Sequence, residues 1–530
     1  MSGAFRAIAR RAWGDGRTRT LSFALLFALA ALVQVVGYEH SYPTVAERLQ
    51  FAESFGDNKA VRLFYGVPHD LISVGGYAAW RVGGVLSIFA AVWGIFAAVR
   101  AQRAEEDDGR AELVLAAPVS RRLVFRAGLA GVGAGIALLW AATWLGLVAG
   151  GLAAGPSAYL ALEIAAVAAV FVAVGSLVGQ LAPTRRLALG LGTAVFAAAF
   201  ALRIVADTAG GLEWLRWATP LGWAEELRPF AGPQPAVLLL IGGATAALLA
   251  ISERIALRRD VGTGLLASRD SAPPRDRLLS SPTALALRSE RGALLGWFAG
   301  IGVYAIVVGL LADTFNAENL SQTLREQLEK FGGASIITPK GALGFYFLFF
   351  AFAISLFACA QMSTARHEES ESRLETLFAM PISRFGWLTG RLALAAAGIV
   401  GLAFGAAVLA WAAAASQGAG IGLGAALEAG LNCVPSSLLF LGLAALAFAL
   451  VPRATAGVAY GLVSVAFLWY LFGALLGAPQ WTLDLSPFQH VAPVPAQPWK
   501  VTAALVMTAI GAAAMASALA LFRRRDILGA

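Results

Sequence analysis

Long apolar stretches alternate with short polar stretches along the whole chain. A helix needs about twenty apolar residues to cross the hydrocarbon core of a bilayer, and twelve stretches approach that length. They lie near residues 21–38, 82–100, 127–152, 158–182, 188–206, 235–252, 293–312, 342–364, 388–415, 427–451, 455–477 and 501–522. Because the stretches are continuously apolar rather than alternating, a membrane β-barrel is excluded. The pattern predicts an all-α polytopic membrane protein of about twelve transmembrane helices.

Composition and charge placement add a topology. The 530 residues are 58% hydrophobic and 14% charged, against about 25% charged in soluble domains. Of the 40 basic residues, 29 fall between stretches on the side of the N-terminus and 11 on the other side. Since the basic side of a membrane protein faces the cytoplasm, we expect both termini to be cytoplasmic. The net charge of +8 then reflects membrane topology, and we expect no nucleic-acid partner.

An acidic loop occurs twice, after the second and the eighth stretch. One copy reads Glu-Glu-Asp-Asp-Gly-Arg-Ala-Glu from residue 105, and the other reads Glu-Glu-Ser-Glu-Ser-Arg-Leu-Glu from residue 368. Both continue into Pro-x-Ser-Arg. The shared charged and proline positions are Glu105, Glu106, Arg110, Glu112 and Pro118 in the first copy and Glu368, Glu369, Arg373, Glu375 and Pro381 in the second.

Later landmarks repeat at the same spacing. Each half closes on Arg-Arg-Asp, at 258–260 and at 524–526, and all equivalent positions lie 263 to 269 residues apart. An even number of spans separates the copies, so the two six-helix repeats are parallel. We expect a first unit at 1–252 with an interfacial N-terminal helix, a cytoplasmic linker with a second interfacial helix at 253–290, and a second unit at 291–530.

The sequence offers no catalytic constellation. The four histidines are scattered, neither Cys-x-x-Cys nor His-x-x-x-His occurs, and no glycine-rich loop carries a P-loop lysine. We therefore expect no enzyme activity, metal or cofactor in this chain. Cys359 and Cys433 lie in apolar stretches and are expected to be free and buried. Glu163, Arg203 and Glu428 lie toward outer ends of spans, where we interpret them as interfacial charges rather than as an ion relay.

The loop pattern Glu-Glu-x-x-x-Arg-x-Glu-x-x-x-x-x-Pro-x-Ser-Arg resembles the permease subunits of ABC-2-type exporters, most closely the double-length actinobacterial branch named for polyketide-antibiotic export. The resemblance covers nearly the whole chain. It implies a pseudo-dimeric ABC-2 (type V exporter) fold in which each loop is a coupling helix that docks on an ATPase. Two copies of a separate ATPase, with ATP and Mg²⁺, would then serve one chain. The two sites are expected to be unequal, because Asp107-Asp108-Gly109 becomes Ser370-Glu371-Ser372.

Several segments outside the acidic loops allow two interpretations each. The N-terminal residues and 283–291 are amphipathic, typical of interfacial elbow helices or of simple anchors. The segments 42–56 and 317–331 are charged and helix-like. The resemblance assigns Trp214, Pro220, Trp481 and Pro487 to an outer gate, whereas a plain aromatic belt would also use them. It places Phe89, Phe200, Phe352 and Trp469 near a substrate cavity, although such aromatics also pack helices or face lipid.

These features predict a permease in the bacterial plasma membrane. The expected function is export of hydrophobic or amphiphilic small molecules, such as a polyketide antibiotic, a drug or a lipid, energised by the ATPase. An ion- or proton-coupled carrier that works alone is an alternative, weakened by the shortage of charges at mid-membrane. A membrane scaffold that binds an ATPase but transports nothing is another alternative.

Overall fold

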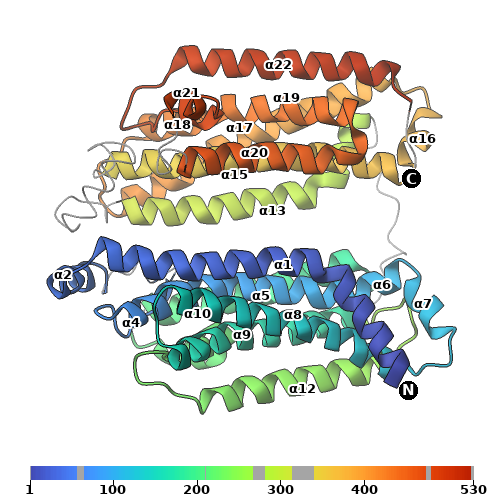
Figure 1. Cartoon of the computed structure of the whole chain (residues 1–530). Helices are drawn as coiled ribbons and strands as arrows, with labels where there is room; N and C mark the ends of the chain where they lie inside the picture. The colour runs from blue at the N-terminus through green and yellow to red at the C-terminus, as the bar shows by residue number, and fades with distance from the viewer. Residues whose placement is uncertain are drawn as a thin grey trace. The chain divides into compact units, whose positions relative to one another are not determined.

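The computed structural model describes residues 2–56, 62, 65–208, 210–266, 281–312, 339–472 and 479–526, and within these ranges every regular element is a helix. The chain divides into two compact units, unit 1 at Met1–Ala272 and unit 2 at Pro273–Ala530 (Figure 1). Because the apolar stretches form helices, each backbone hydrogen bond is satisfied within its own segment, as a bilayer requires.

Unit 1 is built on six long helices. These are α1 (Ser2–Ser41), α5 (Gly84–Val99), α8 (Arg121–Ala149), α9 (Ala154–Leu181), α10 (Arg185–Thr208) and α12 (Val237–Arg258). Short helices join them: α2 (Val45–Phe55), α4 (Val74–Ala78), α6 (Glu105–Asp107), α7 (Arg110–Leu115), the 3-10 helix η3 (Glu213–Ala218) and α11 (Pro220–Glu225). The π-helical turns η1 (Ala79–Gly83) and η2 (Arg100–Ala104) flank α5 and make one continuous helix from α4 to α6.

Unit 2 repeats this order. Its helices are α13 (Pro282–Leu311), α15 (Pro339–Ser370), α16 (Arg373–Phe378), α17 (Arg384–Ser416), α18 (Leu423–Leu431), α19 (Val434–Leu450), α20 (Thr455–Phe472), α21 (Gln480–Leu483), the 3-10 helix η8 (Pro487–His490) and α22 (Val501–Arg524). The described part of the chain contains 11 helices long and apolar enough to cross a membrane, which confirms the predicted polytopic helical fold. The remaining expected span, 455–477, corresponds to α20, and residues 473–478 lie outside the described residues.

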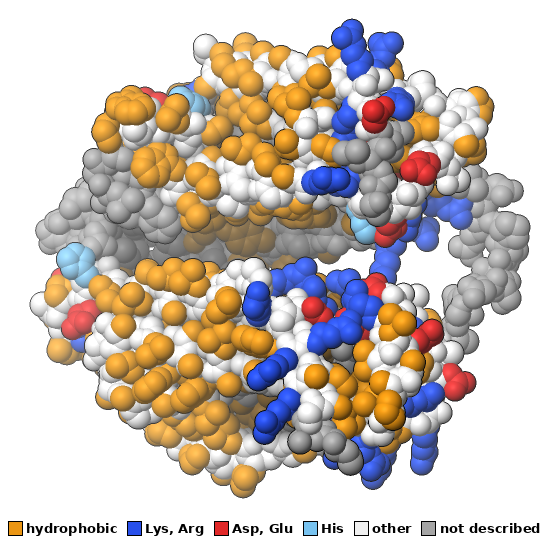
Figure 2. Space-filling view, turned by 45° about the vertical axis from the view of Figure 1, so that its right-hand side comes forward, with side chains coloured by type: hydrophobic (Ala, Val, Ile, Leu, Met, Phe, Trp, Pro, Cys, Tyr) orange, Lys and Arg blue, Asp and Glu red, His pale blue; other side chains and the backbone are white. Residues whose placement is uncertain are grey.

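One helix forms the centre of each unit. In α9 and in the α18–α19 segment, 72% of the most apolar window is buried, whereas only 11% is buried in α12. Glycines let the surrounding helices approach closely: a Cβ on Gly146 would lie 2.3 Å from the Ala28 carbonyl oxygen, and one on Gly442 would lie 2.3 Å from that of Gly511. Hydrophobic side chains cover much of the surface in view, and Arg and Lys gather toward one end of each unit (Figure 2).

Single residues within the spans give a mixed outcome. Cys359 and Cys433 are free and buried, as predicted. Glu428 is exposed. The expectation of interfacial charges is wrong for the other two residues, because Glu163 is only 5% exposed and Arg203 only 2% exposed. Both are enclosed by neighbouring helices, which the hydropathy of their own spans does not indicate.

Candidate functional site

Both acidic loops fold as the same turn followed by a short helix. In unit 1 the turn residue Gly109 has φ +70° before α7, and in unit 2 the turn residue Ser372 has φ +55° before α16. The next long helix begins at a serine cap in each case: Ser120 Oγ accepts from Leu123 N at 3.2 Å, and Ser383 Oγ accepts from Gly386 N at 3.0 Å. The two loops differ most in sequence at the left-handed turn itself.

The two loops occupy corresponding places in their units. In Figure 1, α6 and α7 lie at the end of unit 1 that carries the N-terminus, and α16 lies at the end of unit 2 that carries the C-terminus. We call this the loop end of each unit.

In unit 1, Glu106 turns inward and joins two arginines. Arg259, just after α12, donates through Nη1 to Glu106 Oε2 at 2.8 Å and through Nη2 to the other carboxylate oxygen. Arg103 Nη1 lies 3.1 Å from Glu106 Oε2. Arg121, the first residue of α8, donates to the Arg259 carbonyl oxygen at 2.8 Å. These four residues connect the acidic loop to the helices on either side of it.

Unit 2 builds the same arrangement around Glu369, whose side chain is fully buried. Arg525 Nη2 lies 2.7 and 2.8 Å from the two carboxylate oxygens, and Arg366 Nη1 lies 3.4 Å from one of them. Arg384, the first residue of α17, donates to the Arg525 carbonyl oxygen at 2.5 Å. We call each set of four residues a clasp.

Sequence reasoning missed the clasp, although both of its motifs were noticed. The Glu-Glu pair and the closing Arg-Arg-Asp each recur at nearly one spacing, 263 and 266 residues. The recurrence of the acidic motif and of the basic motif at nearly the same spacing is the signal that could have predicted their contact. Their pairing spans 153 residues in unit 1 and 156 in unit 2, a separation at which local pattern carries no information on contact.

The other glutamate of each pair is also engaged. Glu105 lies 3.1 Å from Arg11 on α1 and 2.8 Å from Arg110. Glu368 pairs with Arg391 on α17, which also pairs with the buried Glu290 on α13.

Exposed groups remain on the short helices. Arg110, Glu112 and Pro118 are exposed in unit 1, and Arg373, Glu375 and Pro381 are exposed in unit 2. Leu113 adds an apolar side chain that is 77% exposed on α7. The structure therefore leaves half of the predicted docking charges on the surface of the loops, while the glutamate pairs hold the loops in place.

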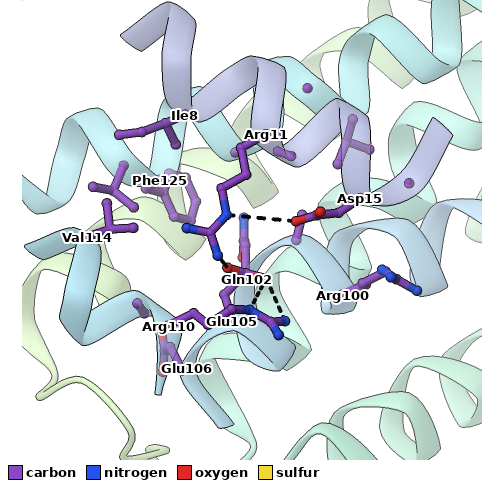
Figure 3. Close-up of a pocket in the computed structure, with 18 of the residues that line it drawn as sticks. Ile8, Arg11, Asp15, Arg100, Gln102, Glu105, Glu106, Arg110, Val114 and Phe125 are labelled. Carbon is purple, nitrogen blue, oxygen red and sulfur yellow. Dashed lines mark hydrogen bonds and ion pairs between the residues drawn. The ribbon is translucent and has the colours of Figure 1, made fainter. Parts of the chain in front are cut away.

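A cavity of about 170 Å³ lies at the loop end of unit 1, between the N-terminal part of α1, α7 and α8 (Figure 3). Ile8, Val114 and Phe125 give it an apolar lining, and Arg11 crosses it to reach Glu105. Figure 1 shows this N-terminal part of α1 bent away from the rest of the helix. The amphipathic start of the chain and the acidic loop thus line one cavity and share one ion pair.

The predicted gate residues lie on short helices before the last span of each unit. Trp214 is 63% exposed on η3 and Trp481 is 69% exposed on α21, while Pro220 begins α11 and Pro487 begins η8. These short helices lie away from the loop ends (Figure 1).

The predicted cavity aromatics lie on α5 and α10 of unit 1 and on α15 and α20 of unit 2. Phe89 and Trp469 are 42% and 36% exposed. Phe352 stacks on Phe467 at 4.2 Å between ring centroids, and Phe200 stacks on Phe196 at 6.0 Å.

Segment 42–56 contains α2, which begins with a capping box between Thr44 and Glu47. Its predicted counterpart, 317–331, lies outside the described residues. The second interfacial segment, 283–291, is the start of α13 and runs on into that span without a break.

Comparison with known proteins agrees with this architecture. Residues 38–253 and 279–523 match the family described as multidrug efflux system permease Rv1217c, C-terminal domain. The chain is 33% identical over 515 residues to the multidrug efflux system permease protein Rv1217c of Mycobacterium tuberculosis (strain ATCC 25618 / H37Rv), covering 95% of this chain and 91% of that protein. This chain is a multi-pass protein of the bacterial plasma membrane. Because the matched ranges cover most of both units, this chain belongs to the Rv1217c family of efflux-system permeases.

Proposed function

We propose that this chain is the membrane-spanning subunit of an ATP-driven ABC-2-type exporter. Its substrates are hydrophobic or amphiphilic small molecules, such as drugs or polyketide antibiotics. The function in the relative's name, multidrug efflux, supports the proposed direction of transport and the substrate class. Because the sequence carries no nucleotide-binding motif, a separate ATPase supplies the energy, and the loop ends face the cytoplasm where that ATPase lies.

The observation that carries the proposal is the pair of clasped loops. A docking element must transmit the movement of its partner to the transmembrane helices without deforming. Each clasp ties the acidic loop to the start of one long helix and to the end of another through charge-assisted hydrogen bonds. The exposed charges on α7 and α16 then meet the ATPase, and Arg11 connects α7's loop to α1. This arrangement suits rigid transmission of ATPase closure to the helices.

The test is reversal of the two exposed glutamates, Glu112→Arg with Glu375→Arg. We expect the amount of ATPase that co-purifies with the tagged chain to fall at least about tenfold, as for loss of interfacial charge complementarity. ATP-dependent efflux of a hydrophobic dye from proteoliposomes should fall with it. The matched control is Glu428→Arg, which changes an exposed glutamate on α18. This helix lies away from the loop end of unit 2 (Figure 1), so the substitution should change neither quantity.

Three outcomes would contradict the proposal. Unchanged co-purification in the double variant would remove the docking assignment. Dye transport without nucleotide would instead favour a carrier that works alone, and binding of the ATPase without any transport would favour a scaffold.

A further inference from the structure

Away from the loop end, unit 1 contains a network of buried ion pairs. Arg216 Nε lies 2.7 Å from Asp207, and Arg203 Nη1 lies 3.3 Å from Glu225. The network continues through Glu226, which lies 3.6 Å from Arg216 and 2.6 Å from Arg228. It joins α10 to η3, α11 and the turn that follows, so it holds the short helices before the last span against the unit.

A fourth carboxylate faces this network without a cation. Glu163 lies on the central helix α9, is only 5% exposed, and lines a cavity of about 40 Å³ together with Glu225, Ser87 and Arg203. Among the described residues it has neither a hydrogen bond nor an ion pair, and the charged group that acts on it is another carboxylate, Glu225. Glu225 and Ser87 line the same cavity. Within the described chain, neither carboxylate oxygen of Glu225 nor the Ser87 hydroxyl has a hydrogen-bond partner.

Charge counting gives this part of the structure one negative charge too many. Within the described residues, the network has three guanidinium groups for four carboxylates. The remaining ionisable groups at the cavity wall do not correct this. Partial desolvation, with Arg228 and Arg216, lowers the pKa of the His69 imidazole, which is therefore neutral at pH 7. Asp70 is satisfied by its own turn, through Ser73 and the Ile72 amide.

A buried carboxylate without a counter-charge is strongly unfavourable. Either one carboxyl group takes up a proton or a bound cation supplies one positive charge in the cavity.

The backbone leaves room for these carboxylates. A Cβ on Gly66, which has φ +80°, would lie 2.1 Å from Glu225 Oε1. A Cβ on Gly83 would lie 3.0 Å from Glu163 Oε1. Glycine at both positions leaves space beside the two acids, and a side chain at Gly66 would require the Glu225 carboxylate to move.

Unit 2 has no such charges at the equivalent positions. Spacings of 267 to 269 residues relate Glu163 to Asn432, Arg203 to Phe472, Arg216 to Leu483, and Glu225 to Ala492. The structure supports this correspondence, because Asn432 Nδ2 donates to the Ala492 carbonyl oxygen at 2.7 Å. Unit 2 therefore satisfies its buried amide internally, while unit 1 carries an acid pair in the same place. The packing of this fold does not itself require the acids.

We propose that the cavity between Glu163 and Glu225 binds one small monovalent cation. Carboxylate and hydroxyl oxygens are the ligands preferred by hard cations, and one positive charge balances the network. A cavity of about 40 Å³ holds roughly three water-sized groups. It accommodates sodium, potassium, ammonium or a hydrated proton, and it is too small for choline.

The test uses the full chain in lipid nanodiscs and follows its thermal unfolding. At pH 8 and constant ionic strength, sodium, potassium or ammonium chloride replaces choline chloride. We expect the bound cation to raise the unfolding midpoint by about 3 °C. In choline chloride, lowering the pH from 8 to 5.5 should raise the midpoint as well, because the native state then binds the proton more tightly than the unfolded state does.

Glu163→Gln should abolish the difference in unfolding midpoint between the salts and reduce the effect of pH on the midpoint. Glu163→Asn, which introduces the residue type found at the equivalent position of unit 2, should do the same. The matched control Glu428→Gln, an exposed glutamate of unit 2, should retain both. A pH effect that depends on Glu163 without any salt effect identifies the proton as the cation. Midpoints that are equal in all salts and at both pH values for the unsubstituted chain overturn the proposal, as does stabilisation by calcium alone.

A second measurement does not depend on folding of the variants. A hydrophobic carbodiimide reacts with protonated carboxyl groups, and mass spectrometry locates the product. Labelling of Glu163 should fall when sodium, potassium or ammonium is added at fixed pH. If none of these cations protects it and labelling does not fall with rising pH either, the site does not bind a cation.

Discussion

Adjacent glutamates in the loops have different roles because a helix turns neighbouring side chains to different sides. Glu106 faces Arg259 in the clasp, whereas Glu105 faces Arg11 and Arg110. Unit 2 divides the work in the same way, with Glu369 in the clasp and Glu368 on Arg391. The identical Glu-Glu pairs therefore do not mark identical environments, and replacement of each member has its own consequence.

Glu369→Gln should destabilise the full chain most among these changes. It leaves Arg366 and Arg525 without their counter-charge, and removal of one partner from a buried ion pair costs about 3 kcal/mol. Glu106→Gln should cost less, because the Glu106 side chain is 14% exposed and Arg103 keeps its ion pair with Asp107.

Glu105→Gln is the matched control. Its side chain is 22% exposed, and surface ion pairs contribute less than about 1 kcal/mol. The measurement is the thermal unfolding midpoint in nanodiscs. Equal shifts for Glu105→Gln and Glu369→Gln would contradict the clasp.

At the level of elements, the turn into each short helix is the unit that recurs. Gly109 adopts the left-handed conformation without strain, while Ser372 adopts it with a Cβ. The same backbone turn is thus kept in unit 2 at some cost in stability. Because Gly109 has no atom within 4 Å of an added Cβ, a substitution there reports the backbone conformation alone.

Gly109→Ala should destabilise the turn by about 1 kcal/mol, and Ser372→Gly should relieve a strain of the same order. Gly133→Ala is the matched control: its added Cβ also meets no atom, but it lies within α8, where alanine is favoured over glycine by about 1 kcal/mol. Hydrogen exchange of the amides of α7 and α16 measures the turns locally. Faster exchange of α7 in Gly133→Ala, or unchanged exchange in Gly109→Ala, would contradict this explanation.

At the level of the whole molecule, the described residues contain a clasped loop in each unit, and unit 1 also contains the acid pair Glu163 and Glu225 at its cavity. The repeat has kept the loop architecture in both units and the Glu163 cavity in unit 1 only. Two halves that descend from one pattern thus share the proposed docking role and divide other roles between them.

If both loops dock, one chain should hold two ATPase subunits. Native mass spectrometry of the complex should give two ATPases per chain, and Glu112→Arg or Glu375→Arg alone should give one. The two single variants should differ in the affinity of the remaining site, because exposed Leu113 on α7 has threonine, Thr376, at the position 263 residues later in α16. A ratio of one in the unsubstituted complex would contradict docking at both loops.

The sequence by itself determined the class of fold, the repeat and the position of both loops. Span length and continuous apolarity are local properties that the bilayer imposes on each helix separately, so no tertiary contact is needed to recognise them. The αL turn was also present in the sequence as a glycine in one copy, though its serine counterpart concealed the match in the other.

Only the tertiary structure decided which charges are available to a partner. Glu106 and Arg259 are separated by 153 residues, and their contact depends on how the second and last helices of unit 1 both pack against α9. The same holds for Glu163 and Arg203, which hydropathy places near the membrane surface and packing encloses within unit 1. The sequence of one segment predicts only whether a charged residue is exposed or interfacial. The packing of neighbouring helices determines whether that residue is desolvated, paired or facing a cavity.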